Sequence, residues 1–345
     1  MQVDIKTSGI QPIRQTFSHI ARRFGADKPA TRYQEATLDL QPTVNFHYKP
    51  LWQPQYELYD ARRTAIVMAD WYAFRDPRHY YYGVYVQARA KQQEVQESNF
   101  EFVERRGMLR DAAETDRALL ARLLVPLRHY EWGANMNNSA VVAYGYGAAI
   151  TQAAHFHTMD RLGLAQYVTR IGLLLDGNGT AVLEQAREDW LGEPCWQDIR
   201  ACMEKLFVTA DWFEVLLVQN FLFDGLVYPL AMNRLEQVLA PQAASGYALS
   251  TEFAKSWYGE NVRWMDASLR TAAAESPANA ALLKQWIEHW LPALIDAFRP
   301  WASAAFDEQA EAALAEAAGE LVARAAQAGI VVNASSPSVS AGSKP

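Results

Sequence analysis

The chain has 345 residues, of which 50% are hydrophobic and 21% charged, so it can bury a large core and is expected to be globular. Its net charge of −7, without a long block of Lys or Arg, excludes general binding to nucleic acid and to an anionic membrane surface. The amino terminus has no apolar signal core and no stretch has the continuous apolarity of a membrane span, which predicts a cytoplasmic chain without a membrane partner.

Residues 1–78 are predicted to form an extended amino-terminal arm that docks on a partner subunit. Prolines interrupt this segment repeatedly, and so long a loop-rich stretch is unusual in a compact domain. Its aromatic residues need a surface that buries them, and they include Phe46, Tyr48, Trp52, Tyr56 and Tyr59. Asp76 and Pro77 have the character of a helix cap followed by a first helical residue.

Residues 79–327 are predicted to form one helical domain. Breaks rich in Gly, Pro or Asn separate expected helices at about 80–106, 112–143, 148–175, 179–191, 195–207, 209–240, 248–275, 278–297 and 300–327. Pro126 and Pro229 are expected to kink their helices. Several helices are long without a sustained heptad repeat, which favours a large bundle over a coiled coil. The polar residues 328–345 are expected to be disordered.

The segment from Trp132 to Met159 has no formal charge and is the most lipid-like part of the chain. Its asparagines, its glutamine and its two histidines would be costly in hydrocarbon, which favours burial in protein. Its many small residues favour tight helix packing, with a ligand pocket as the alternative interpretation. Cys195 and Cys202 are about 10 Å apart along a predicted helix, so we expect reduced packing residues.

A carboxylate-bridged di-iron site in a bundle requires Glu-x-x-His on each of two helices, since this spacing puts both ligands on one helix face. The seven histidines provide no such pair, and the only carboxylate match, Asp76 with His79, lies at the expected helix start. His155 and His157 would point to opposite sides of a helix, which argues against joint chelation. No nucleophile elbow, phosphate-binding loop or zinc spacing is present. The sequence therefore predicts no catalytic, cofactor-binding or metal residue on this chain.

Several motifs together nevertheless closely resemble the β subunit of bacterial multicomponent phenol hydroxylases, which belong to the soluble di-iron monooxygenases. They are RRFGADKPATRYQEA, NFHYKPLW, FRDPRHYYYGVYVQARA, LVPLRHYEWGANMNNS, MDRLGLAQYVTRIGLLLDG and WYGENVRWMDA. The resemblance covers residues 2–325 and implies an all-α, ferritin-like bundle with extra helices. It also implies assembly with α and γ subunits as (αβγ)₂, with di-iron on the α subunit. A regulatory effector protein and a reductase carrying FAD and a 2Fe-2S cluster complete such a system.

The resemblance further implies that this chain retains the positions, but not the residues, of a di-iron site. The six vestigial positions would be Glu131, Asp160, Gly163, Asn220, Asn261 and Trp264. Two carboxylates without imidazole partners are expected to hold no iron, and Trp264 is expected to fill part of the vacated volume. Arg263 is the expected partner of any carboxylate that remains buried there.

These observations predict a structural, non-catalytic subunit of a phenol monooxygenase that hydroxylates an aromatic ring with O₂ and NADH. The resemblance places the substrate pocket on the α subunit, so the substrate range belongs to that chain. Two alternatives stay open, which are the β subunit of a toluene/o-xylene-type monooxygenase and an autonomous helical binding protein.

Overall fold

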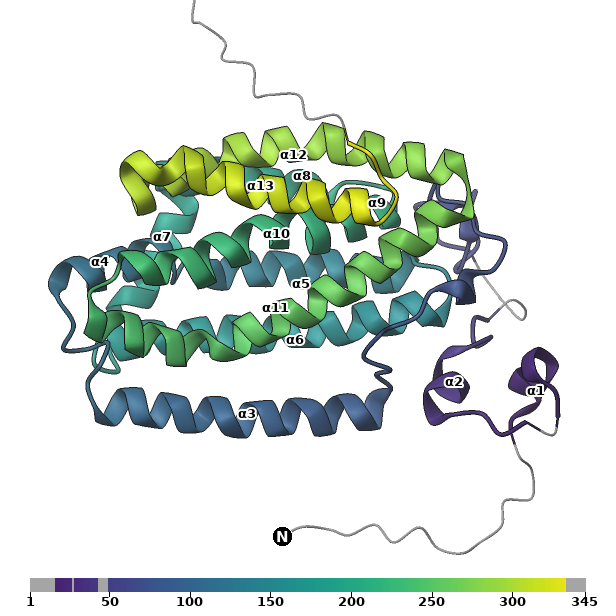
Figure 1. Cartoon of the computed structure of the whole chain (residues 1–345), viewed down its shortest axis with the longest axis horizontal. Coiled ribbons are helices and arrows are strands. Elements are labelled where there is room, and N and C mark those ends of the chain that lie inside the picture. Colours follow the sequence, from purple (N-terminus) through teal and green to yellow (C-terminus); the bar gives the residue numbers. More distant parts are fainter. Residues whose placement is uncertain (1–15, 27, 43–48, 333–345) are drawn as a thin grey trace, which may run out of the picture.

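The computed structural model describes residues 16–26, 28–42 and 49–332, and every regular element in these ranges is a helix (Figure 1). The amino-terminal part carries α1 (Ser18–Phe24), α2 (Arg32–Thr37), η1 (Ala61–Arg63) and η2 (Trp71–Ala73). The body begins with α3 (Tyr82–Arg105), α4 (Glu114–Leu123), α5 (Leu127–Tyr144), α6 (Ala148–Leu175), α7 (Ala181–Gly192) and α8 (Pro194–Phe207). It ends with α11 (Pro241–Glu275), α12 (Pro277–Phe306), η6 (Asp307–Gln309) and α13 (Ala310–Gln327).

Between α8 and α11 one irregular helical run passes through the middle of the bundle. Its segments are α9 (Trp212–Leu217), the π-helix η3 (Val218–Phe223), α10 (Asp224–Val227), the π-helix η4 (Tyr228–Arg234) and the 3-10 turn η5 (Leu235–Val238). In Figure 1 this run lies between α5, α11 and the α12–α13 layer, and it packs on all of them. Long π-helical segments are rare and frequently mark functional positions, so this run is where a site is expected.

The central run is also the most apolar segment of the described chain. By length and composition Trp212–Val238 could cross a membrane, but 94% of its most apolar window is buried inside the bundle. It is therefore a core helix, and its apolar side chains pack against the surrounding helices. The expectation that Trp132–Met159 is the most lipid-like segment was therefore wrong.

Most helix boundaries agree with the expected ones, and the differences have local causes. Residues 241–246 belong to α11 because Pro241 occupies its first turn, where a missing N–H costs nothing. Pro300 lies inside α12, which ends instead at Phe306 and is followed by Asp307 with a φ of 47°. Pro126 separates α4 from α5 rather than kinking one helix, and Pro229 lies in η4.

The expected arm docks in part on the chain's own bundle. Ile66, Trp71 and Phe74 are buried in the main core, with exposures of 1%, 7% and 2%. Backbone N–H groups of this segment donate to the bundle, as Ala65 does to Asp211 at 2.7 Å. Residues 60–78 are therefore part of the helical domain, because their apolar side chains find their surface within the same chain.

Two smaller expectations, about the start of α3 and the carboxy-terminal boundary, also change. Asp76 accepts from the N–H of Arg78 and closes a turn, whereas α3 begins after Tyr81 without a side-chain cap. Ile330 is 1% exposed, so the ordered chain continues past residue 328. Phe46, Tyr48 and residues 333–345 lie outside the described residues.

Candidate functional site

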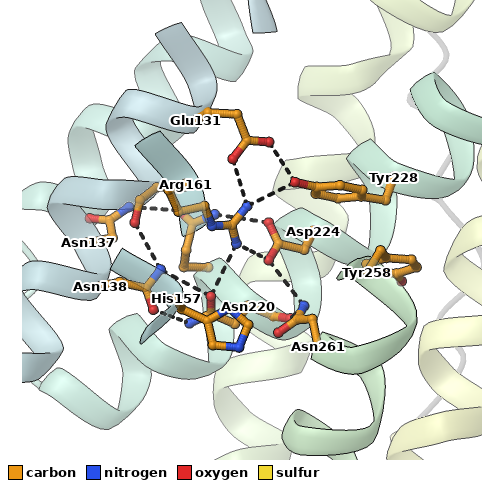
Figure 2. Close-up of polar contacts among 12 residues, drawn as sticks. Glu131, Asn137, Asn138, His157, Arg161, Asn220, Asp224, Tyr228, Tyr258 and Asn261 are labelled. Carbon is orange, nitrogen blue, oxygen red and sulfur yellow. Dashed lines mark hydrogen bonds and ion pairs between the residues drawn. The ribbon is translucent and has the colours of Figure 1, made fainter. Parts of the chain in front are cut away.

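A buried network of polar side chains lies where the helices of the bundle meet the central run (Figure 2). We call it the Arg161 network, and its six principal members come from α5, α6, η3, α10, η4 and α11 respectively: Glu131, Arg161, Asn220, Asp224, Tyr228 and Asn261. All six are at most 1% exposed. Because it joins elements far apart in sequence, only the tertiary fold creates it.

Arg161 is the centre of the network. Its Nη1 donates to Oε2 of Glu131 at 3.0 Å, and its Nη2 donates to the carboxylate of Asp224 and to Oδ1 of Asn220 at 3.2 Å. The ring of Trp257 packs on the guanidinium, with Cζ 4.5 Å from its centroid. One cation thus binds two carboxylates, a geometry that the planar fork of Arg favours over Lys.

Neighbouring side chains supply further hydrogen bonds to both carboxylates. The hydroxyl of Tyr228 donates to Oε1 of Glu131 at 2.7 Å, and the hydroxyl of Tyr130 donates to Oδ1 of Asp224 at 2.6 Å. Nδ2 of Asn261 donates to Oδ2 of Asp224 at 3.2 Å. Each buried charge therefore has several partners, which buried charges require.

The amide of Asn220 is paired as well. It exchanges hydrogen bonds with the amide of Asn138 at 3.0 and 3.1 Å, so both side chains are held in one orientation. Asn220 and Asp224 are four residues apart across the junction of η3 and α10, and both reach the same guanidinium. This amide pair fixes the end of the network that faces α5.

The charge states follow from burial and from these contacts. Burial raises the pKa of Glu131, and the guanidinium of Arg161 opposes that rise. Burial alone would lower the pKa of Arg161, but Asp224 and Glu131 hold it well above its usual value. The centre of the bundle therefore carries a permanent cation.

A second polar cluster lies next to the Arg161 network, and Trp257 contacts both. Arg89 of α3 donates from Nε and Nη2 to Asp160 at 2.8 Å each, and from Nη2 to Glu260 at 2.9 Å. Asp160 also accepts from the hydroxyl of Tyr85 at 2.7 Å and from the indole of Trp257 at 2.9 Å. This Arg89 cluster fastens α3 to α6 and α11.

The structure brings together three of the six expected positions, namely Glu131, Asn220 and Asn261. Asp160 belongs to the Arg89 cluster instead, and a Cβ at Gly163 would meet nothing within 4 Å. On α6 the side chain inside the network is Arg161, one residue after the expected position. Asp160 and Arg161 have different partners because successive side chains on a helix point about 100° apart.

Trp264 is 1% exposed and stacks on the ring of His157, with centroids 4.4 Å apart. His157 is fully buried, and its Nε2 lies 3.3 Å from Nη1 of Arg78. Burial, followed by the charge of Arg78, places the pKa of His157 well below its usual value. His155 is exposed, so the expectation that the two histidines occupy opposite helix faces is confirmed.

The expected role of Arg263 was wrong. Its side chain is exposed, and the cations that neutralise Glu131 and Asp160 are Arg161 and Arg89. Both cysteines are buried and free, as expected, and burial raises the pKa of the Cys195 thiol to about 11.

The sequence did not point to three members of the network, which are Arg161, Asp224 and Tyr228. Asp224 is the only charged residue between Glu214 and Arg234, in a segment that is otherwise apolar or amide-bearing. Since a charge in such a core segment needs a buried partner, it predicts a cation on a facing helix. Arg161 lies within the apolar pattern of α6 and could have been recognised as that cation.

The Arg161 network does not fit a di-iron centre. A guanidinium occupies the space between the two facing carboxylates, and the remaining members offer amides and phenols in place of imidazoles. Among the described residues, no group of three or more His, Cys, Asp or Glu is arranged to hold a metal ion. Di-iron sites need several anionic ligands and imidazoles, whereas here the positive charge comes from the protein itself.

The sequence matches the methane/phenol/alkene hydroxylase family over residues 52–276. The chain belongs to this family. It is 49% identical over 305 residues to the oxygenase component DmpL of phenol 2-monooxygenase from Pseudomonas sp. (strain CF600), covering 88% of this chain and 92% of that protein. It is 25% identical to the hydroxylase component subunit beta of the toluene-4-monooxygenase system of Ectopseudomonas mendocina, covering 82% and 87% of the two chains.

A solved relative extends this similarity to the whole fold. A chain of the phenol hydroxylase from Pseudomonas sp. OX1, solved under xenon pressure, superposes with a TM-score of 0.89 at 44% identity and covers 96% of this chain and 99% of its own. The expected all-α, ferritin-like hydroxylase fold and the resemblance to a phenol hydroxylase subunit are both confirmed. As a member of the hydroxylase family, the chain is related to di-iron enzymes, although its own centre holds Arg161.

Proposed function

We propose that this chain is a structural, non-catalytic β subunit of the hydroxylase component of a multicomponent phenol monooxygenase. The single observation that carries the proposal is the guanidinium of Arg161 between Glu131 and Asp224, in a network at most 1% exposed. The cation stabilises both carboxylates and occupies the space between them. The chain would fold and position the catalytic subunit without taking part in the oxidation.

The complete system would follow the architecture of its relatives. An α subunit would hold the di-iron centre, which activates O₂ when bound, and a γ subunit would complete an (αβγ)₂ assembly. A reductase with FAD and a 2Fe-2S cluster would deliver electrons from NADH, and an effector protein would regulate turnover. We place the assembly in the cytoplasm, without nucleic-acid or membrane partners.

Phenol is favoured over toluene as the substrate of the assembly because of the difference in similarity. The chain shares 49% identity with a phenol 2-monooxygenase component and 25% with a toluene-4-monooxygenase subunit. An autonomous helical binding protein is disfavoured by the size of the hollow near Trp132, which measures about 140 Å³. Drug-sized ligands occupy pockets of about 300 Å³ or more.

The amino-terminal segment presents an exposed apolar turn that could contact a neighbouring subunit. Leu51 and Trp52 are 92% and 72% exposed, although Arg63 holds the loop around them by hydrogen bonds to Gln53 and Glu57. A turn that presents two large apolar side chains to solvent is suited to insertion into a neighbouring subunit. We propose this contact for the part of the expected arm that does not pack on its own bundle.

Purification of the native complex tests the proposed function. We expect the chain to co-purify with a larger subunit, and we expect iron and NADH-dependent phenol hydroxylation to depend on that subunit. After separation and anaerobic iron loading, the isolated chain should hold far less than one iron per molecule. Stoichiometric iron on the isolated chain, or hydroxylation by it alone, would overturn the proposal.

A further inference from the structure

The hairpin of α5 and α6 presents an outward face that the described chain leaves uncovered. We call it the hairpin face, and its exposed members are Trp132, Met136, Ala143, His155, Leu162 and Gln166. On each helix they are separated by four, seven or eleven residues, which places them on one stripe. Nδ2 of Asn135 donates to the backbone oxygen of Thr158 at 2.7 Å, so the two stripes lie beside one another.

This face carries no formal charge. There is no Asp, Glu, Lys or Arg from Trp132 to Met159, and none of the exposed members beyond this range is charged. By contrast, the exposed side of α13 carries Glu311, Glu316 and Glu320. An ordinary solvated helix face resembles that of α13, whereas depletion of charge with exposed Trp and Met is typical of the core of a protein interface.

The dimensions of the face agree with an interface between subunits. On α5 the exposed members run from Trp132 to Ala143, which is about 17 Å at the helical rise. Two packed helices are about 20 Å wide, so the hairpin face measures on the order of 300 Å². A stable interface buries about 800 Å² on each partner, of which this face would supply a little under half.

The edge of the face provides two complementary features. A hollow of about 140 Å³, lined by Trp132, Gly133, Met203 and Phe207 among others, could hold one apolar side chain of a partner. Arg128 is half-buried at the start of α5 and forms no ion pair with the described residues, and burial lowers its pKa. A carboxylate of the partner would complete this position.

We infer that the hairpin face is the docking surface for a different subunit of the same hydroxylase, which covers it with an uncharged, largely apolar helical surface and places one carboxylate near Arg128. The inference rests on the proposed function. The choice of a different subunit follows from the relatives, which are named as components and subunits of larger hydroxylases. A second copy of this chain is the competing occupant.

The test introduces one charge into the face at positions that the isolated chain tolerates. Met136→Lys and Leu162→Lys change side chains that are 44% and 46% exposed, so circular dichroism and thermal unfolding of the isolated chain should remain unchanged. Val238→Lys is the matched control, since Val238 is 42% exposed on η5, which packs on α11 and α12. Each variant is co-expressed with the other hydroxylase subunits, and its affinity for the larger subunit is measured.

We expect each hairpin-face variant to bind the larger subunit at least about thirtyfold more weakly, as for a central interface position, and the Val238 variant to bind normally. Normal binding of both face variants would overturn the inference while leaving the proposed function intact. Failure of the wild-type chain to bind any larger subunit would instead overturn the proposed function. A wild-type homodimer that both face variants dissociate, with binding of the larger subunit unchanged, would assign the face to a second copy and overturn the inference.

Discussion

The guanidinium of Arg161 donates to the carboxylate of Glu131 at 3.0 Å, and both side chains are at most 1% exposed. The same guanidinium binds Asp224, so a single cation holds two helices and the central run together. Such a network exacts a large desolvation penalty, and the low dielectric of the core makes every partner necessary. Removal of any one partner would therefore leave a buried charge without compensation.

Replacing Arg161 should severely destabilise the chain. In Arg161→Met, Glu131 and Asp224 lose their cation in a site from which water is excluded, and we expect the free energy of unfolding to fall by about 3–5 kcal/mol. Urea unfolding of the isolated chain measures this. Arg263→Met, at an exposed position, should change it by less than about 0.5 kcal/mol. Adding Asp224→Asn to Arg161→Met should recover part of the loss, and equal effects at Arg161 and Arg263 would contradict the prediction.

Restoring one carboxylate should not create an iron site. In Asn261→Glu a third carboxylate would join Glu131 and Asp224, while Arg161 still occupies the centre and both imidazoles remain missing. We expect no iron after anaerobic loading and a lower thermal unfolding temperature, because Asp224 loses the hydrogen bond from Asn261 and gains a like charge. Metal analysis and calorimetry provide the two readouts, and stoichiometric iron in this variant would refute the prediction.

Two helical glycines should respond to alanine in opposite directions. A Cβ at Gly163 meets nothing within 4 Å, so Gly163→Ala should stabilise the chain by about 0.5–1 kcal/mol through its better helix propensity. A Cβ at Gly225 would lie 3.0 Å from Cγ and 3.2 Å from Cδ1 of Leu321, so Gly225→Ala should destabilise by about 1–3 kcal/mol. Thermal unfolding compares the two, and a loss of stability in Gly163→Ala would show that this position is packed.

Acid should destabilise the isolated chain partly through its buried and half-buried histidines. Burial, with a contribution from Arg128, lowers the pKa of His129 to about 4 from about 6.5 in an unfolded chain. Between these values the unfolded state binds a proton that the folded state does not, so the stability contributed by neutral His129 is present above about pH 6.5 and lost toward pH 4. His157 has the same sign, and its loss extends to lower pH.

His129→Gln isolates this contribution. We expect its free energy of unfolding to decline less steeply than that of the wild type between pH 6.5 and pH 4, because one titrating group has been removed. His155→Gln, at an exposed position, should follow the wild-type curve. Urea unfolding across this pH range makes the comparison, and an unchanged slope in His129→Gln would contradict the assignment.

The sequence alone determined the helical class of the chain and most of its helix boundaries. Periodic apolar residues and local signals such as Pro194 and Pro277 at helix starts act over a few residues, so they can be read without the fold. The motifs also indicated the family, and the sequence shows directly that no Glu-x-x-His pair is present. Glu131, Asn220 and Asn261 were placed near one another through the resemblance before their contacts were known.

The tertiary structure alone decided which cation meets which carboxylate. A one-residue change on α6 exchanges Asp160 for Arg161 inside the network, because successive side chains on a helix point about 100° apart. Likewise, residues 60–78 have the composition of an arm, but their apolar side chains find a surface on the bundle more than a hundred residues away in sequence. Pairings of this kind depend on distances between helices that no local pattern encodes, and they settled the roles of Arg161, Asp224 and Arg263.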